Sequence, residues 1–189
     1  MSHFYAMLFR MKYINRWSLM RNMRTETLSE HTLEVAFIAH ALAVLSKERL
    51  GKAVDAEAVL LCALFHDTPE IITGDLPTPI KYYNRQINEA YGQIETNAQK
   101  KLLSLLPADL QKEYEAVFNP NPQVKQLVKA ADKIQALLKC TDEIACGNRE
   151  FAVAKASTLQ SIHAMQCPAA ELFLEEYLPS FSLALDEQK

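Results

Sequence analysis

The sequence has little of what sharp turns and paired strands require. Only four of its 189 residues are glycine, and the alternation of apolar and polar residues that marks a half-buried strand is nowhere sustained. Long runs of Ala, Leu, Glu, Lys and Gln instead favour helices. The length fits one domain with a sizeable apolar core. We therefore predict an all-α fold in which residues 1–189 form a single domain.

Other absences narrow the function. The formal net charge is only -3, and the basic residues are scattered, which argues against a general nucleic-acid surface. No run reads as long and apolar enough to span a bilayer, and the start lacks the pattern of a signal peptide. The four cysteines form no C-x-x-C pair and are expected to be reduced, mostly buried thiols. These features predict a cytoplasmic protein with neither a nucleic-acid polymer nor a membrane as partner.

Capping residues mark where the helices should begin and end. Thr27 and Glu30 have the spacing of a capping box, Gly51 is a suitable stop, and Asp55 can cap the next helix. A surface loop is expected at 73–79, where turn-forming residues gather, with Thr78 as the cap of the following helix. Other expected helices cover residues 2–14, 58–65, 79–106, a short segment after Pro107, 123–146, 149–165 and 169–177.

The most informative stretch is an apolar run that ends in His66 and Asp67. Isolated ionisable side chains are costly to bury, so this pair requires hydrogen bonds or a metal ion. Two further candidates lie on strongly patterned helices. His31 is at a helix start among polar neighbours, and Asp132 lies at the margin of an apolar arc. Together these four residues, from three segments, predict one metal site.

Some of these residues also have ordinary explanations. Asp132 could cap a helix or pair with a lysine or arginine. His40 is nine residues from His31, about half a turn around the helix, so the two cannot face one site. His40 is therefore expected to be an ordinary hydrogen-bonded core or surface histidine.

The order of these residues resembles the signature of the HD-domain metal-dependent phosphohydrolases: a His, a His-Asp pair 35 residues later and an Asp 65 residues beyond that. The segments 14–17, 24–31 and 73–79 look more narrowly like those of bacterial 5'-deoxynucleotidases of this superfamily. The likeness extends over nearly the whole chain to residues 178–181. It implies a helical HD-domain fold, hydrolysis of deoxyribonucleoside 5'-monophosphates, and a homodimer.

The resemblance also implies the site. It makes His31, His66, Asp67 and Asp132 the ligands of one divalent ion. Such a ligand set suits Co, Mn, Fe, Ni or Zn. Because the remaining histidines, His3, His40 and His163, are scattered, the His-rich arrangement that holds two metals is not expected. The residues implied at the substrate are Arg16, Trp17, His31, Asp67, Asp75, Leu76, Pro77 and Thr78.

Three side chains have physical properties that match catalytic or binding roles. Arg16 offers a fork of donors for phosphate oxygens, and the sole tryptophan, Trp17, offers a rigid apolar face for a sugar or base. Their ordinary alternatives are a surface ion pair and a core anchor. Glu70 follows His66 by four residues, so a continued helical turn would lean its carboxylate over the same site as a catalytic group. Its alternative is a solvated glutamate.

Two rival functions remain open at this point. One is another HD phosphohydrolase that acts on a nucleotide tri- or tetraphosphate. The other is a non-catalytic HD module that senses a nucleotide. The presence of both Glu70 and Arg16 argues against the second.

Overall fold

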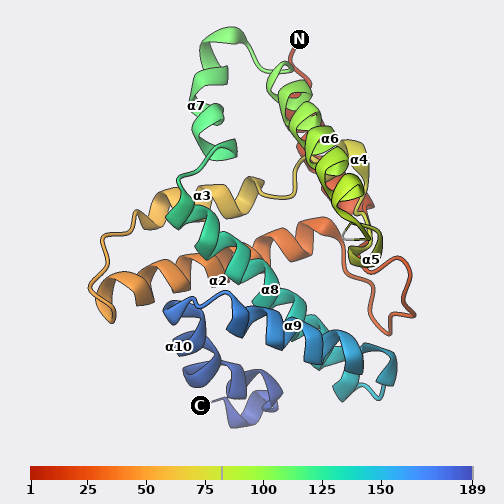
Figure 1. The fold of residues 1–189 in the computed structure, drawn as a ribbon, viewed down its shortest axis with the longest axis vertical. Coiled ribbons are helices and arrows are strands. Elements are labelled where there is room, and N and C mark those ends of the chain that lie inside the picture. Colours follow the sequence, from red (N-terminus) through yellow and green to blue (C-terminus); the bar gives the residue numbers. More distant parts are fainter. Residues whose placement is uncertain (82, 189) are drawn as a thin grey trace. The chain divides into compact units, whose positions relative to one another are not determined.

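In the computed structural model, which describes residues 1–81 and 83–188, the regular structure is helical (Figure 1). Among those residues the β structure is one isolated antiparallel bridge between Asn15 and Thr27. The predicted all-α fold is confirmed. The elements are α1 (Phe4–Leu8), η1 (Phe9–Tyr13), α2 (Leu28–Glu48), α3 (Ala56–Phe65), α4 (Glu70–Thr73), α5 (Thr78–Lys81), α6 (Arg85–Leu103), α7 (Ala108–Phe118), α8 (Pro122–Ala145), η2 (Arg149–Phe151), α9 (Ala152–Ala164), α10 (Pro168–Glu176), η3 (Leu178–Ser182) and η4 (Leu185–Glu187).

The chain divides into two compact units. Unit 1 contains Met1–Arg21, Thr25–Thr32 and Phe65–Asn119. Unit 2 contains Asn22–Arg24, Leu33–Leu64 and Pro120–Lys189. The first turn of α2 therefore belongs to unit 1, and the rest of that helix belongs to unit 2.

Unit 2 holds a large apolar core. Its helices α8 and α9 lie side by side (Figure 1), and α2, α3 and α10 also contribute buried side chains. Full burial of one aliphatic or aromatic side chain is worth about 1.5–3 kcal/mol, so this core stabilises unit 2. All four cysteines lie in unit 2 as free thiols, three buried and Cys146 exposed, as predicted.

Unit 1 has a smaller apolar cluster beneath its longest helix. Phe4, Leu102 and Leu106 are buried together there, and the rings of Phe65 and Tyr114 pack edge to face against each other. Helix α6 contacts α1, α4, α5 and α7. It is therefore the element against which the other helices of unit 1 pack.

The predicted caps are present and determine where two site histidines lie. The Thr27 backbone N–H donates to Glu30 Oε2 at 2.7 Å, and the Glu30 N–H donates to Thr27 Oγ1 at 3.3 Å, which completes the capping box. Asp55 Oδ1 accepts from the Ala58 N–H at 3.0 Å at the start of α3. His31 consequently lies in the first turn of α2, and His66 directly follows the last residue of α3.

Helix α2 contradicts one expectation. It is 21 residues long and contains an 18-residue stretch with a mean hydropathy of 1.3, so by length and composition it could cross a membrane. The prediction that no run is long and apolar enough was therefore wrong. Within the protein 56% of that stretch is buried, and its residues Val35, Ala39 and Leu42 belong to the core of unit 2. This packing explains the apolar residues on the buried face of α2.

Two predicted helices are interrupted. The helix expected over 2–14 is α-helical only to Leu8 and continues as the tighter 3-10 turn η1. The helix expected over 79–106 is wrong as one element, because α5 ends at Lys81 and α6 begins at Arg85. Asn84 causes the restart, since its side chain accepts from the Ile87 N–H at 2.8 Å as an N-cap.

Candidate metal and substrate site

His31, His66 and Asp67 converge in unit 1. His31 is fully buried in the first turn of α2. Its Nε2 lies 3.3 Å from Asp67 Oδ2, and His66 Nε2 lies 3.1 Å from the same oxygen. One ligand atom from each residue lies within 4.8 Å of the other two. Two imidazole nitrogens and a carboxylate oxygen in this arrangement can hold a first-row divalent ion.

Asp67 is held in its charged form. Burial opposes ionisation, but the attraction of His66 and hydrogen bonds from both histidines outweigh it and hold the pKa of Asp67 well below its usual range. Metal ligands must be deprotonated, so this carboxylate is ready to bind a cation across the neutral range.

Asp132 is not part of this three-residue cluster. It lies half-buried on α8, next to the buried Ala131, and so borders the core as its pattern predicts. Helix α8 belongs to unit 2, whereas the three clustered residues belong to unit 1. The role of Asp132 as a fourth ligand stays a prediction.

Glu26 connects the loop between η1 and α2 to the cluster. Arg16 Nη1 donates to Glu26 Oε2 at 2.7 Å and also lies 2.7 Å from His31 Nδ1. The Trp17 indole N–H donates to the same Glu26 oxygen at 3.2 Å. Glu26 is only 8% exposed. It therefore orients both predicted substrate residues, a role that the sequence interpretation missed.

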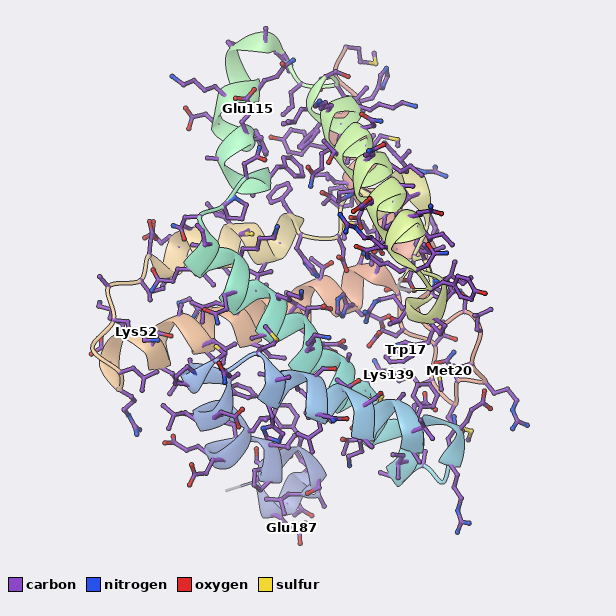
Figure 2. All side chains as sticks on the ribbon, viewed as in Figure 1. Trp17, Met20, Lys52, Glu115, Lys139 and Glu187 are labelled. Atoms are coloured by element: carbon purple, nitrogen blue, oxygen red, sulfur yellow. The ribbon has the colours of Figure 1, made fainter. Side chains whose placement is uncertain are left out.

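The backbone of Trp17 is unusual. Its φ of 59° lies in the left-handed region, which bulky residues rarely adopt and which is often found at functional sites. The Met20 N–H donates to the Trp17 carbonyl at 3.0 Å and closes a turn on this loop, where Figure 2 labels both side chains. Trp17 is half-buried. It is therefore not the core anchor that was its alternative.

Glu70 begins α4, and its N–H donates to the Asp67 carbonyl at 3.0 Å. The side chain is 7% exposed, so the solvated alternative is wrong. Burial, reinforced by the negative charges of Asp67 and Asp75, raises the pKa of Glu70 to about 9. Among the described residues, no group hydrogen-bonds its Oε2. This oxygen is therefore available to a water or a substrate.

The loop that follows α4 carries the remaining predicted substrate residues. Asp75 accepts a hydrogen bond from the Trp17 backbone N–H, and burial raises the pKa of the Asp75 carboxyl although Arg16 attracts its charge. Leu76 and Pro77 are half-buried, and Thr78 is exposed at the start of α5. Asp75 is thus the member of this loop that contacts the Arg16–Trp17 segment.

Comparisons with known proteins agree with this geometry. A family model described as 5'-deoxynucleotidase YfbR-like matches residues 3–181. The 5'-deoxynucleotidase yfbR of Photorhabdus temperata and the 5'-deoxynucleotidase of Yersinia pestis (strain Pestoides F) are each 48% identical to this chain, covering 99% of it and 96% of the relative.

Two solved structures show the fold. An HD-domain phosphohydrolase from Listeria innocua matches with a TM-score of 0.83 and 25% identity, covering 95% of this chain and 88% of that one. The second is a cyanophage S-2L HD phosphohydrolase, DatZ, which was solved bound to dA and one catalytic Zn2+ ion. It matches with a TM-score of 0.66 and 17% identity, covering 93% of this chain and 96% of that one. The predicted HD-domain fold is confirmed.

Proposed function

Because the chain belongs to the 5'-deoxynucleotidase YfbR-like family, we propose that it is a metal-dependent 5'-nucleotidase. It hydrolyses deoxyribonucleoside 5'-monophosphates to deoxyribonucleosides and phosphate. The observation that carries this proposal is the cluster of His31, which is buried, with the half-buried His66 and Asp67 and with the Arg16 guanidinium beside it. Metal ligands and a phosphate-binding side chain together can activate a water and bind the phosphate group for phosphate-ester hydrolysis.

One divalent ion is proposed at this cluster, held by His31, His66 and Asp67 with Asp132 as the fourth ligand. The donor set fits Co, Mn, Fe, Ni or Zn. When bound, such an ion polarises a phosphoryl group and lowers the pKa of a bound water. The ionised state of Asp67 and the complete burial of His31 support the assignment.

The surrounding side chains take the other roles. Arg16 donates to the phosphate oxygens and stabilises the negative charge that develops on them. Glu70 orients the attacking water through its unbonded Oε2, or takes the proton of that water if the charge of a bound cation lowers the raised pKa of Glu70 and ionises it. The water oxygen bonds to phosphorus as the bond between phosphorus and the 5'-oxygen breaks, and the proton lost by the water passes to that oxygen, so the nucleoside leaves as an alcohol. Trp17 and the loop of residues 75–78 enclose the deoxyribose.

Residues 1–189 act as one HD-type phosphohydrolase domain in this proposal, and the match over residues 3–181, which includes parts of both units, supports that. The protein is proposed to be cytoplasmic and a homodimer. An apolar stripe on α2 supports self-association, because Leu33, Phe37 and Val44 are exposed. At about 100° per residue they lie within about 40° of one another.

The direct test is phosphate release from paired ribo- and deoxyribonucleoside monophosphates, after chelation and re-addition of single metals. We expect no release after chelation, restoration by one or more of the five metals, and faster hydrolysis of the deoxy substrate. Hydrolysis of tri- or tetraphosphates instead of monophosphates would favour the rival phosphohydrolase. Nucleotide binding without any turnover would favour the sensing module.

A further inference from the structure

One face of α6 is directed at the substrate loop. Asn88, Tyr91 and Glu95 are spaced i, i+3 and i+7, which puts them within about 60° of one another on a helix. The two short helices that flank residues 74–77, α4 and α5, both pack against α6 (Figure 1). This face therefore meets the loop where it leaves α4 and where it ends in α5.

Tyr91 holds the first end of the loop. Its hydroxyl lies 3.3 Å from Thr73 Oγ1 and donates to the Gly74 carbonyl at 3.5 Å. Thr73 Oγ1 donates to the same carbonyl at 3.0 Å. Gly74 has a φ of 73°, so the chain turns sharply here as it leaves α4. The Tyr91 side chain is 7% exposed, so these contacts are sheltered from water.

Lys81, at the second end, is held by all three side chains of this face. Glu95 Oε1 accepts from Lys81 Nζ at 2.8 Å, and this ammonium lies 4.8 Å from the centre of the Tyr91 ring. Asn88 Nδ2 donates to the Lys81 carbonyl at 3.3 Å. The Lys81 and Glu95 side chains are 27% and 30% exposed, which makes this pair better sheltered than an ordinary surface ion pair.

We propose that Asn88, Tyr91 and Glu95 form a clamp, the α6 clamp, that holds both ends of the loop and so positions residues 75–78 for the substrate. They are positioning residues, since they contact the ends of the loop and not the cluster of metal-binding groups. A loop that is already ordered loses less conformational freedom when a ligand binds. Loss of the clamp should therefore raise KM more than it lowers kcat. This expectation rests on the proposed function, whereas the clamp itself rests on the contacts.

The test uses Tyr91→Phe and Glu95→Gln in the full, metal-loaded chain. Tyr91→Phe removes the hydroxyl and keeps the ring under Lys81, and Glu95→Gln removes the charge. The matched control is Glu89→Gln, because Glu89 accepts from Arg85 Nε at 2.6 Å on the same helix, with side chains that are 57% and 89% exposed. It is the same substitution in an ion pair that does not touch the loop.

Two kinds of measurement are made: hydrogen exchange of the backbone amides within residues 74–81, other than the prolines 77 and 79, and the kinetic constants kcat and KM for a deoxyribonucleoside 5'-monophosphate. The amides of Gly74, Ile80 and Lys81 donate to backbone carbonyls and report on loop order. We expect faster exchange there in both clamp variants. We also expect KM to rise about three- to tenfold, the range for losing one hydrogen bond, with kcat within about twofold. Glu89→Gln should match the wild type.

Several results would overturn the clamp: exchange and KM equal to those of the control, a fall in kcat at unchanged KM, or faster exchange spread evenly over unit 1. The last result would indicate general packing. If the wild type releases no phosphate from any nucleotide, the proposed function fails. The exchange comparison then still decides whether the clamp exists.

Discussion

Two buried glutamates in this protein are in opposite electrostatic states. Glu143, on α8, is 2% exposed, and Glu70, on α4, is 7% exposed. For Glu143, burial opposes ionisation, but hydrogen bonds led by the one from Lys139 lower its pKa to about 2. For Glu70, burial and the charges of Asp67 and Asp75 raise the pKa to about 9. Burial alone therefore does not determine the charge of a buried carboxyl.

The difference lies in the donors. Glu143 accepts from the ammonium of Lys139, from the backbone N–H groups of Met23 and Arg24 at 2.9 and 3.2 Å, and from Asn148 Nδ2 at 2.8 Å. Lys139 also donates to the Arg24 carbonyl, so the pair fixes residues 22–24 within unit 2. Glu70 has an oxygen that no described group bonds. The ionised carboxylate of Glu143 is used for structure, and the carboxyl group of Glu70 keeps one oxygen unbonded for chemistry.

The largest effect is expected at the metal cluster beside Glu70. His66→Ala or Asp67→Ala should abolish metal retention and activity while the helical fold remains, because an open catalytic site contributes less to folding than the apolar core does. Metal analysis and circular dichroism check this. Full activity in a metal-free variant would refute a catalytic role for the metal. Complete unfolding would indicate that the metal site is structural.

Removal of Lys139, the ion-pair partner of Glu143, is expected to lower the stability of the fold. Lys139→Met should lower the free energy of unfolding by about 3 kcal/mol, at the low end for breaking a buried ion pair because three other donors to Glu143 remain. Denaturant titration measures this. The control is Arg85→Met, which breaks an exposed i,i+4 pair and should change stability little. If both substitutions change the free energy of unfolding equally, the buried Lys139–Glu143 pair stabilises the fold no more than an exposed pair does.

The lowered pKa of Glu143 predicts an acid dependence. A group whose folded-state pKa is depressed stabilises the protein fully above its unfolded pKa of about 4.3, and this contribution is lost as the pH falls towards about 2. This contribution of Glu143 to the free energy of unfolding is about 3 kcal/mol. The stability difference between the wild type and Glu143→Gln should therefore shrink between pH 6 and pH 3. A difference that stays constant over this interval would contradict the assignment.

The smallest expected effect concerns sugar selection. If Trp17 and the loop of residues 75–78 enclose the deoxyribose, an added 2'-hydroxyl is buried without a partner, which gives about tenfold discrimination against ribonucleotides. Trp17→Ala should narrow the ratio of kcat/KM between a deoxyribonucleotide and its ribonucleotide. Arg16→Ala should weaken both substrates, since they share the same phosphate. Equal hydrolysis of both sugars by the wild type would make this prediction wrong.

Local signals in the sequence were sufficient for much of the fold. The Thr27 and Glu30 capping box, the Asp55 cap and the position of His66 just after an apolar helix depend on neighbouring residues, and all are confirmed. The break between α5 and α6 was missed because Asn84 acts as a cap only when its own backbone is extended, here with a φ of -154° and a ψ of 170°. Helix propensity alone does not reveal whether Asn84 lies inside one long helix or caps a new one.

The missed contacts are those set by tertiary structure. Glu26 meets Arg16 because residues 15 and 27 pair in one isolated bridge, which is too short for any alternation to show. Lys139 with Glu143 and Arg85 with Glu89 have the same i,i+4 charge pattern, yet the first pair is buried and the second exposed. Pair spacing does not indicate which helix face the fold will cover.

The most direct test exchanges one carboxyl for an amide in each region, Glu70→Gln and Glu143→Gln, and measures both kcat and the free energy of unfolding of the metal-loaded proteins. We predict that Glu70→Gln lowers kcat roughly 10²–10⁴-fold, the range for losing an acid-base group, without loss of stability or of metal. Glu143→Gln should lower stability and leave the kcat of the folded enzyme within about twofold of the wild type. An unchanged kcat in Glu70→Gln, or an equal loss of kcat in both variants, would contradict the division between a catalytic carboxyl group with an unbonded oxygen and a fully bonded structural carboxylate.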